Sequence, residues 1–273
     1  MTSTSPDQTG AGPEADRAGV SSRHWVREYE HEVLSRLQRL TDLADAGGLD
    51  EAIALVADCV GSGGVVHAFG TGHSEAFAME VAGRAGGLIP TNRVALRDAV
   101  LLGDHDVEEL YGRPPLERDP AIVDDLWATI PRQDGDLFVI ASNSGVNGSV
   151  VGTALLAKEH GHRVIAVTSL EHTAAVEPKH PSGRRLSEVA DVVVDNLAPY
   201  GDATLTSVGD IAVGAVSSLT SAYVAQLLTV GATRVLADRG QEAPLYVSAN
   251  VPGGDDHNHE LEARYGDRIR RGA

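Results

Sequence analysis

A short loop rich in glycine and hydroxyl groups offers the chemistry to bind a phosphate. It follows an apolar run at 65–69 and consists of Gly70, Thr71, Gly72, His73 and Ser74. The glycines allow backbone angles and a close ligand approach that a side chain would forbid, so that amide N–H groups can point at one spot. Ser74 stands where an N-cap residue belongs, and the helix expected behind it would present its positive end to an anion.

A glutamate on that expected helix could act as a general base. Glu80 follows Ser74 within two turns, and the residues around it, between 77 and 82, are mostly apolar. An apolar environment of this kind favours a carboxyl group with a catalytic role. The alternative is a surface ion pair with Arg84, four residues further on. Glu75, at the start of the helix, is the second candidate for the base.

A second loop of the same character follows another apolar run, at 137–141. It contains Ser142, Asn143, Ser144, Gly145 and Asn147. Two such loops are more specific than either alone, because ligands of open α/β sheets bind at the carboxyl ends of the strands. The second loop suits a phosphate monoester better than a metal ion. The alternative is that its residues only form a turn and cap a helix.

The elements that must hold the two loops alternate between strand and helix. We expect strands at 65–69, 137–141, 163–168 and 191–195, with helices between them that include 120–130 and 148–160. This alternation implies a parallel sheet covered by helices, and we predict an α/β fold, a three-layer α-β-α sandwich. Residues 92–118 show no regular pattern, and so long a loop inside a compact domain is usually functional or mobile.

Four segments are predicted along the 273 residues. They are a disordered tail at 1–20, N-terminal helices at 21–62, the α/β domain at 63–240, and a C-terminal extension at 241–273 that completes the site. The tail has almost no large apolar side chain to bury. The longest helix candidate spans 208–236, with a capping signal in Thr206 or Ser207 followed by Asp210.

Composition excludes several classes of function. The formal net charge of −17 would repel nucleic acid and anionic membranes, so we expect neither as a partner. Cys59 is the only cysteine, so no intramolecular disulfide and no thiolate metal cluster can form. No other group has metal-ligand spacing, and we expect no metal and no cofactor. The sequence shows neither a signal peptide nor a membrane-spanning run, which points to the cytoplasm.

The two loops and their helices resemble the SIS (sugar isomerase) domain family over roughly residues 45–240. In that family, sugar-phosphate sites are built from two such loops. The segment from Glu80 to Arg84 resembles the Glu-x-x-Gly-Arg segment of sedoheptulose-7-phosphate isomerases, in which the glutamate is a catalytic base. The N-acetylmuramic acid 6-phosphate etherases also carry a base on this helix. Here the glutamate follows Ser74 about one turn sooner than in either group.

Three further segments resemble a subfamily of stand-alone SIS proteins that includes an N-acetylglucosamine-6-phosphate dehydratase. They are His180 to Gly183, Gly201 to Ala203, and Ser248 to Asn258. The resemblance implies that a carboxylate removes the proton at C2 of an open-chain sugar phosphate. An isomerase would then reprotonate C1, whereas a dehydratase or etherase expels the substituent at C3. The resemblance also implies a homodimer, or a dimer-based oligomer, with shared active sites.

Two departures from the isomerases favour elimination. The heptose isomerases carry a histidine on the helix after the last strand, and residues 208–230 contain none. The amidotransferase-linked isomerases use a C-terminal lysine, whereas the only lysines here are Lys158 and Lys179. A proton-shuttling group must then come from elsewhere. The candidates are His257 first, then His180, with His259 and His73 as alternatives.

We therefore predict a lyase that dehydrates N-acetylglucosamine 6-phosphate. Glu80 would abstract the proton, and His257 or His180 would assist ring opening or the departure of water. Loop residues would bind the substrate and its phosphate, namely Thr71, Gly72, His73, Ser74, Ser142, Asn143, Ser144, Gly145 and Asn147. An aldose-ketose isomerase of the same substrate class and a non-catalytic phosphosugar sensor are the alternatives.

Overall fold

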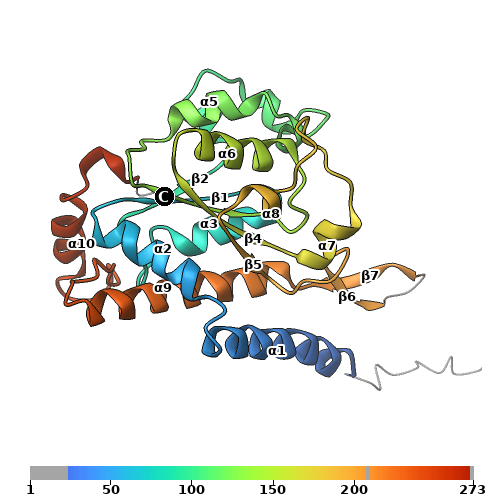
Figure 1. The fold of residues 1–273 in the computed structure, drawn as a ribbon, viewed down its shortest axis with the longest axis horizontal. Coiled ribbons are helices and arrows are strands. Elements are labelled where there is room, and N and C mark those ends of the chain that lie inside the picture. Colours follow the sequence, from blue (N-terminus) through green and yellow to red (C-terminus); the bar gives the residue numbers. More distant parts are fainter. Residues whose placement is uncertain (1–23, 207–209, 271–273) are drawn as a thin grey trace, which may run out of the picture.

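A five-stranded parallel sheet forms the centre of the molecule (Figure 1). Its strands lie in the order β2-β1-β3-β4-β5, and every neighbouring pair is parallel. From β1 to β5 the strands span Val66–Gly70, Thr91–Val94, Leu137–Ala141, Arg163–Thr168 and Val192–Asp195. The computed structural model describes residues 24–206 and 210–270, so the tail predicted for 1–20 lies outside the described residues.

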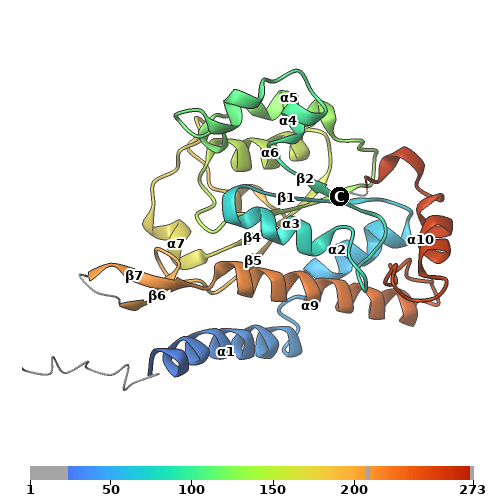
Figure 2. The ribbon, with the colours of Figure 1, turned by 180° about the vertical axis from the view of Figure 1, so that it is seen from behind.

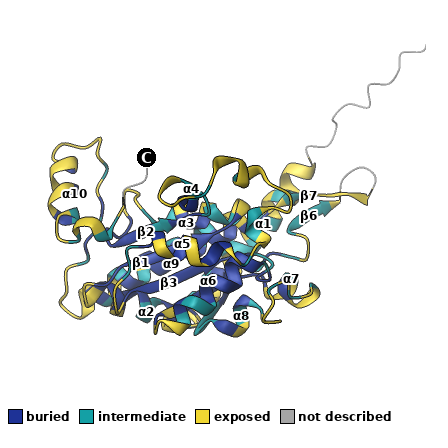
Figure 3. Ribbon diagram, turned by 90° about the horizontal axis from the view of Figure 1, so that it is seen from above, coloured by how far each residue is buried: buried dark blue, intermediate teal, exposed yellow. Residues whose placement is uncertain are grey.

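Helices cover both faces of the sheet, because alternate strand residues point to opposite sides. Val139 and Ile165 pack against the helices of one face, and Phe138 and Ala166 against those of the other. The first face carries α2 (Asp50–Gly61), α3 (Glu75–Val81) and α9 (Ser217–Asp238), and the second carries α5 (Ile122–Thr129), α6 (Gly148–Glu159) and α8 (Leu186–Val189). Figure 3 shows the buried residues gathered in the sheet and in the helices against it. The predicted three-layer α/β fold is confirmed.

The N-terminal helix α1 (His24–Asp45) stands off from the sheet and lies along α9 (Figures 1 and 2). The hydroxyl of Tyr29 donates to the backbone oxygen of Ala215 over 2.7 Å, and Thr41 bonds to Tyr223 over 2.7 Å. Of the described residues of α1, Leu40 alone is buried. Much of the apolar surface of this helix therefore remains uncovered in one chain.

A hairpin occupies part of the segment predicted as one long helix from 208 to 236. Its strands are β6 (Ala203–Thr206) and β7 (Ala212–Ala215), and α9 begins only at Ser217. Of the two predicted caps, Thr206 lies in β6 and does not cap α9, and Ser207 lies outside the described residues. Asp202 caps α9 instead, because its carboxylate accepts hydrogen bonds from the backbone N–H groups of residues 216 and 217.

The C-terminal segment lies at the amino ends of the strands. It contains α10 (Gly254–Glu262) and a 3₁₀ turn at Gly266–Arg268. Arg268 in this turn donates to the backbone oxygen of Gly63, just before β1, and to the carboxylate of Asp136, just before β3. Figure 1 shows α10 on the opposite side of the sheet from α7 (Leu170–Ala175) and the hairpin, which follow the carboxyl ends of β4 and β5. No helix among the described residues is long and apolar enough to span a membrane.

Candidate functional site

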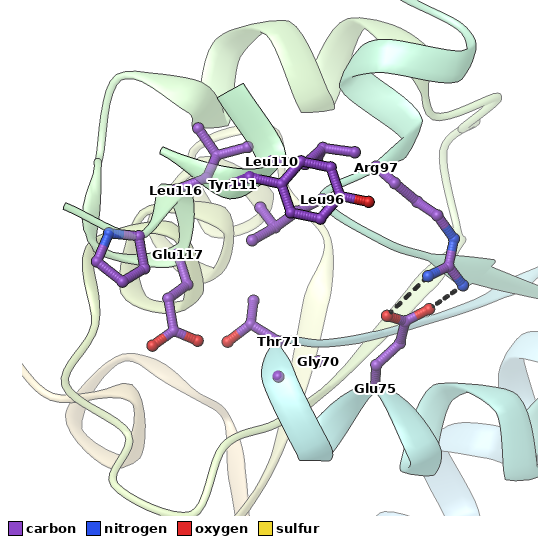
Figure 4. A pocket seen from close by; sticks show the side chains of 11 residues that line it. Gly70, Thr71, Glu75, Leu96, Arg97, Leu110, Tyr111, Leu116 and Glu117 are labelled. Carbon is purple, nitrogen blue, oxygen red and sulfur yellow. Dashed lines mark hydrogen bonds and ion pairs between the residues drawn. The ribbon is translucent and has the colours of Figure 1, made fainter. Parts of the chain in front are cut away.

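The described part of the chain has a pocket of about 380 Å³ at the carboxyl end of β1 (Figure 4). Three segments line it. The first loop supplies Gly70–Gly72 together with Glu75, the end of β2 leads to Leu96 and Arg97, and the roof comes from Leu110, Tyr111 and 115–117. The roof belongs to the segment 92–118, which was expected to be irregular. Its first residues form β2, and α4 (Asp98–Leu101) and 3₁₀ turns at Val107–Tyr111 and Leu116–Arg118 follow.

The first loop makes a sharper turn than a simple strand-to-helix connection. A Cβ on Gly70 would lie 2.3 Å from the backbone oxygen of Ser74, and Gly72 has a positive φ of 55°. Both positions therefore favour glycine. A 3₁₀ turn at Gly72–Ser74 precedes α3, so Ser74 is itself helical and its side chain makes no cap bond to any described residue. Ser74 therefore stands at the predicted N-cap position of α3 but forms no capping bond, whereas Thr71 lines the pocket as a buried residue.

The second loop uses part of its polar groups to hold its own shape. The hydroxyl oxygen of Ser142 accepts the backbone N–H of Gly145 over 3.1 Å, and the φ of Gly145 is 63°. The side-chain oxygen of Asn143 accepts the amide of Asn196 over 3.2 Å. Asn147 stands at the N-terminus of α6 without a cap bond to any described residue. The side chain of Ser142 thus stabilises the turn, and that of Asn143 bonds to a residue that follows β5, while Asn147 and the partly buried Ser144 retain polar groups for a ligand.

Glu117 connects the two loops, and sequence reasoning did not single it out. Its Oε1 accepts a hydrogen bond from the side-chain amide of Asn147 over 3.2 Å, and its Oε2 lies 3.5 Å from the position that a Cβ on Gly72 would take. Figure 4 shows the carboxylate beside the hydroxyl of Thr71. The backbone oxygen of Glu117 is held by the hydroxyl of Ser149 over 2.8 Å. The only signal in the sequence was its place in the long segment expected to be functional.

A second carboxylate, Glu75, lies on the opposite side of the pocket from Glu117 (Figure 4). Both of its oxygens accept hydrogen bonds from the guanidinium of Arg97, so the positive charge of Arg97 compensates the negative charge of Glu75. No lysine or histidine is among the described residues that line the pocket. Glu117 has no ion pair with any described residue, which leaves the pocket an uncompensated negative charge.

The predicted base, Glu80, does not line this pocket. It lies one and a half turns beyond Glu75 on α3 and faces α9, where its Oε1 accepts the side-chain amide of Gln226 over 2.7 Å. The same oxygen forms an ion pair with Arg84, which is the alternative that the sequence offered to a catalytic role. Met79, beside Glu80 on α3, is 54% exposed, and Val230, four residues after Gln226 on α9, is 57% exposed.

The predicted histidines lie away from the pocket. His180 bonds to Ser182, and its ring lies against Gly152 of α6; burial lowers its pKa. His257 is on α10, where its Nε2 hydrogen-bonds to the backbone oxygen of Leu245 over 3.0 Å. His73 is exposed on the first loop. In one chain, therefore, His257 is at the opposite edge of the sheet, and its catalytic role stays a prediction that needs a second chain.

A histidine outside the pocket anchors its roof. The ring nitrogens of His105 contact the carboxylates of Glu109 and Asp125, each over 2.8 Å. Hydrogen bonds to both carboxylates raise the pKa of His105, because both ring nitrogens can donate only when the imidazole is protonated. This contact ties the turn at Val107–Tyr111, which carries two residues of the roof, to α5.

We expect the roof to loosen as the pH rises. The raised pKa means that the stabilisation is complete below the unfolded value of about 6.5 and is lost as the pH passes the folded value. Hydrogen exchange of residues 102–118, corrected for intrinsic rates, should be faster relative to the rest of the chain at alkaline than at acidic pH. In His105→Gln this difference should disappear. Equal pH dependence in the variant and the parent chain would contradict the role of His105.

The described residues contain no group of three or more His, Cys, Asp or Glu side chains that could hold a metal ion. The polar side chains among the described residues that line the pocket are hydroxyls and carboxylates, with one arginine that is already paired. The carboxylates can accept hydrogen bonds from a ligand that carries several hydroxyl groups.

Comparison with known proteins places the chain in a family. The model of the SIS domain matches residues 28–169. The chain belongs to the SIS domain family. It is 34% identical over 245 residues to a UPF0309 protein of Listeria innocua, covering 89% of this chain and 97% of that protein. A UPF0309 protein of Streptomyces avermitilis is 34% identical over 251 residues, with 92% and 98% covered.

A solved structure has the same fold as this SIS domain. A phosphoheptose isomerase from Francisella tularensis superimposes with a TM-score of 0.51 at 15% identity, covering 77% of this chain and 97% of the other. This similarity concerns the fold alone. The predicted family is thus confirmed, while membership of the dehydratase subfamily stays a prediction.

Proposed function

We propose that this SIS domain protein is a lyase that dehydrates N-acetylglucosamine 6-phosphate. The observation that carries the proposal is the convergence of both predicted loops on one place, where Glu117 contacts Asn147 and lies beside Gly72. Polar loops that meet at the carboxyl edge of a parallel sheet form the usual ligand site of such folds. The structural relative from Francisella tularensis is by name an isomerase of a phosphorylated sugar, which agrees with the substrate class.

The phosphate would bind between the loops. Asn147 and Ser144 would donate to its oxygens from the start of α6, where the helix dipole favours an anion. Thr71, which lines the pocket, would donate from the first loop. The sugar would then extend under the roof, where Leu96, Leu116 and Tyr111 offer apolar and aromatic surface.

Proton abstraction at C2 needs a carboxylate, and we propose Glu80 in a site shared by two chains. One oxygen of Glu80 is fixed by Gln226 and Arg84, and the other has no hydrogen bond to a described residue and could take up the proton. The exposed Met79 and Val230 mark the surface that a second chain would cover. Glu75 is the alternative within one chain, although Arg97 already binds both of its oxygens.

We prefer elimination over isomerisation because α9 contains no histidine, whereas the heptose isomerases carry one on the helix after the last strand. The expelled C3 oxygen needs an acid, and the described lining of the pocket offers carboxyl groups but neither histidine nor lysine. His257 or His180 could supply a proton only from another chain or after a rearrangement. A non-catalytic sensor would bind the same ligand without any change to it.

The reaction can be followed by NMR and mass spectrometry after incubation with N-acetylglucosamine 6-phosphate in deuterated water. We expect loss of one water molecule from the sugar. Uptake of deuterium at C1 without loss of water would show an isomerase instead. Binding without any chemical change would support the sensor, and the absence of both binding and turnover would contradict the proposed substrate.

A further inference from the structure

The carboxylate of Glu117 occupies the place where the phosphate of the substrate is proposed to bind. Its Oε1 takes the side-chain N–H of Asn147 over 3.2 Å, and its Oε2 reaches towards Gly72 in the first loop. Figure 4 shows it beside the hydroxyl of Thr71. These are the donors that the phosphate would use.

We propose that Glu117 determines specificity by making the site reject free inorganic phosphate and accept a sugar phosphate. This proposal rests on the proposed function of the site. A phosphate that takes the amide of Asn147 must displace the carboxylate or lie next to it, and two anions at contact distance repel each other strongly where water is partly excluded. Inorganic phosphate brings little to offset this repulsion.

A sugar phosphate, by contrast, brings hydroxyl groups that can donate to the displaced carboxylate. Charge-assisted hydrogen bonds of this kind are roughly twice as strong as neutral ones. The carboxylate would then exchange one donor, Asn147, for another, a hydroxyl of the sugar. Ser149 holds the backbone oxygen of Glu117, so the exchange would take place by rotation of the Glu117 side chain.

The second carboxylate of the pocket does not have this role. Glu75 is neutralised by Arg97 on the opposite side, whereas Glu117 forms no ion pair with a described residue. Asn147 also points its amide group, and not its oxygen, at Glu117, and that oxygen is buried without a partner among the described residues. Asn147 is therefore oriented as a donor towards an anion.

The test is to measure the affinity of the full chain for inorganic phosphate and for N-acetylglucosamine 6-phosphate by isothermal titration calorimetry. In Glu117→Gln we expect inorganic phosphate to bind about tenfold more tightly, and the preference for the sugar phosphate to fall by at least the same factor. Glu117→Ala should show the same gain for phosphate. The matched control is Glu108→Gln, which removes the same charge from an exposed position of the same segment and should leave both affinities unchanged.

Unchanged, weaker or undetectable phosphate binding in both Glu117 variants would overturn the proposal, as would an equal gain in Glu108→Gln. Thermal unfolding of each variant shows whether it is folded. Failure of the proposed function looks different: the parent chain would then bind no sugar phosphate, while the gain for inorganic phosphate in Glu117→Gln would still appear.

Discussion

Replacing Asp136 with alanine is expected to lower the free energy of unfolding by about 3 to 5 kcal/mol, because it removes one partner of a buried charged network. Asp136 is 2% exposed and immediately precedes β3. Its oxygens accept hydrogen bonds from His67 on β1 over 3.1 Å and from Arg268 in the C-terminal turn over 2.7 Å. Two backbone N–H groups, those of Val65 and Gln133, also donate to it over 2.8 Å.

These bonds decide the charge of the group. Burial alone would raise the pKa of Asp136, but the hydrogen bonds from His67 and from the two backbone amides outweigh burial and hold it below its ordinary value. Burial lowers the pKa of His67, so this ring is neutral in the folded chain at neutral pH. Arg268 therefore supplies the positive charge opposite Asp136, and the alanine variant would leave it without its partner.

Urea unfolding of Asp136→Ala beside Asp134→Ala measures the effect. Asp134 is exposed two residues earlier, and its loss should change stability by no more than about 0.5 kcal/mol. Because Arg268 attaches the C-terminal turn to Asp136, we expect the C-terminal segment to become accessible to proteases in Asp136→Ala before the rest of the chain. A loss of stability similar to that of Asp134→Ala would contradict the role of the network.

Local patterns in the sequence located most of the sheet. The strands at 137–141 and 163–168 were predicted to the residue, because both are apolar runs bounded by turn residues. The hairpin at 203–215 was not predicted, because its strands are short and half exposed. The residues that follow it have a helical pattern, and the predicted helix was therefore extended back over β7. Asp202 is far in sequence from the helix start that it caps, so no local capping pattern shows it.

Contacts between distant residues could not be predicted from the sequence. Asp136 and Arg268 are separated by 132 residues, and Asn147 and Glu117 by 30. Glu117 lies in a segment without periodicity, so only the folded chain brings it to the second loop. The direction of Glu80 depends likewise on where α9 crosses α3, and this placed the predicted base against Gln226 and outside the pocket of its own chain.

The largest effect on activity is expected for Glu80→Gln, which should lower turnover of N-acetylglucosamine 6-phosphate by about 10² to 10⁴-fold, the usual contribution of a general base. The amide keeps the shape of the side chain but cannot take up a proton. The matched control is Arg84→Gln, which breaks the same surface ion pair and leaves the carboxylate in place. Such pairs contribute little to stability, so this control should retain most of the turnover.

Mixing two inactive variants then tests whether the site is shared. Glu80→Gln removes the proposed base, and Asn147→Ala removes a proposed phosphate ligand that lies on another part of the chain. If the base of one chain and the phosphate loop of its partner form one site, one of the two sites in each mixed dimer carries both changes and the other carries neither.

Random mixing should therefore restore about a quarter of the parent activity, since half of the dimers are mixed and each has one intact site. If both groups act within one chain, every site carries one defect and mixing restores nothing. If Glu80→Gln loses activity and mixing does not restore it, Glu80 acts within the site of its own chain. If Glu80→Gln keeps full activity, Glu80 is not the base, and Glu75 is the carboxylate to test next.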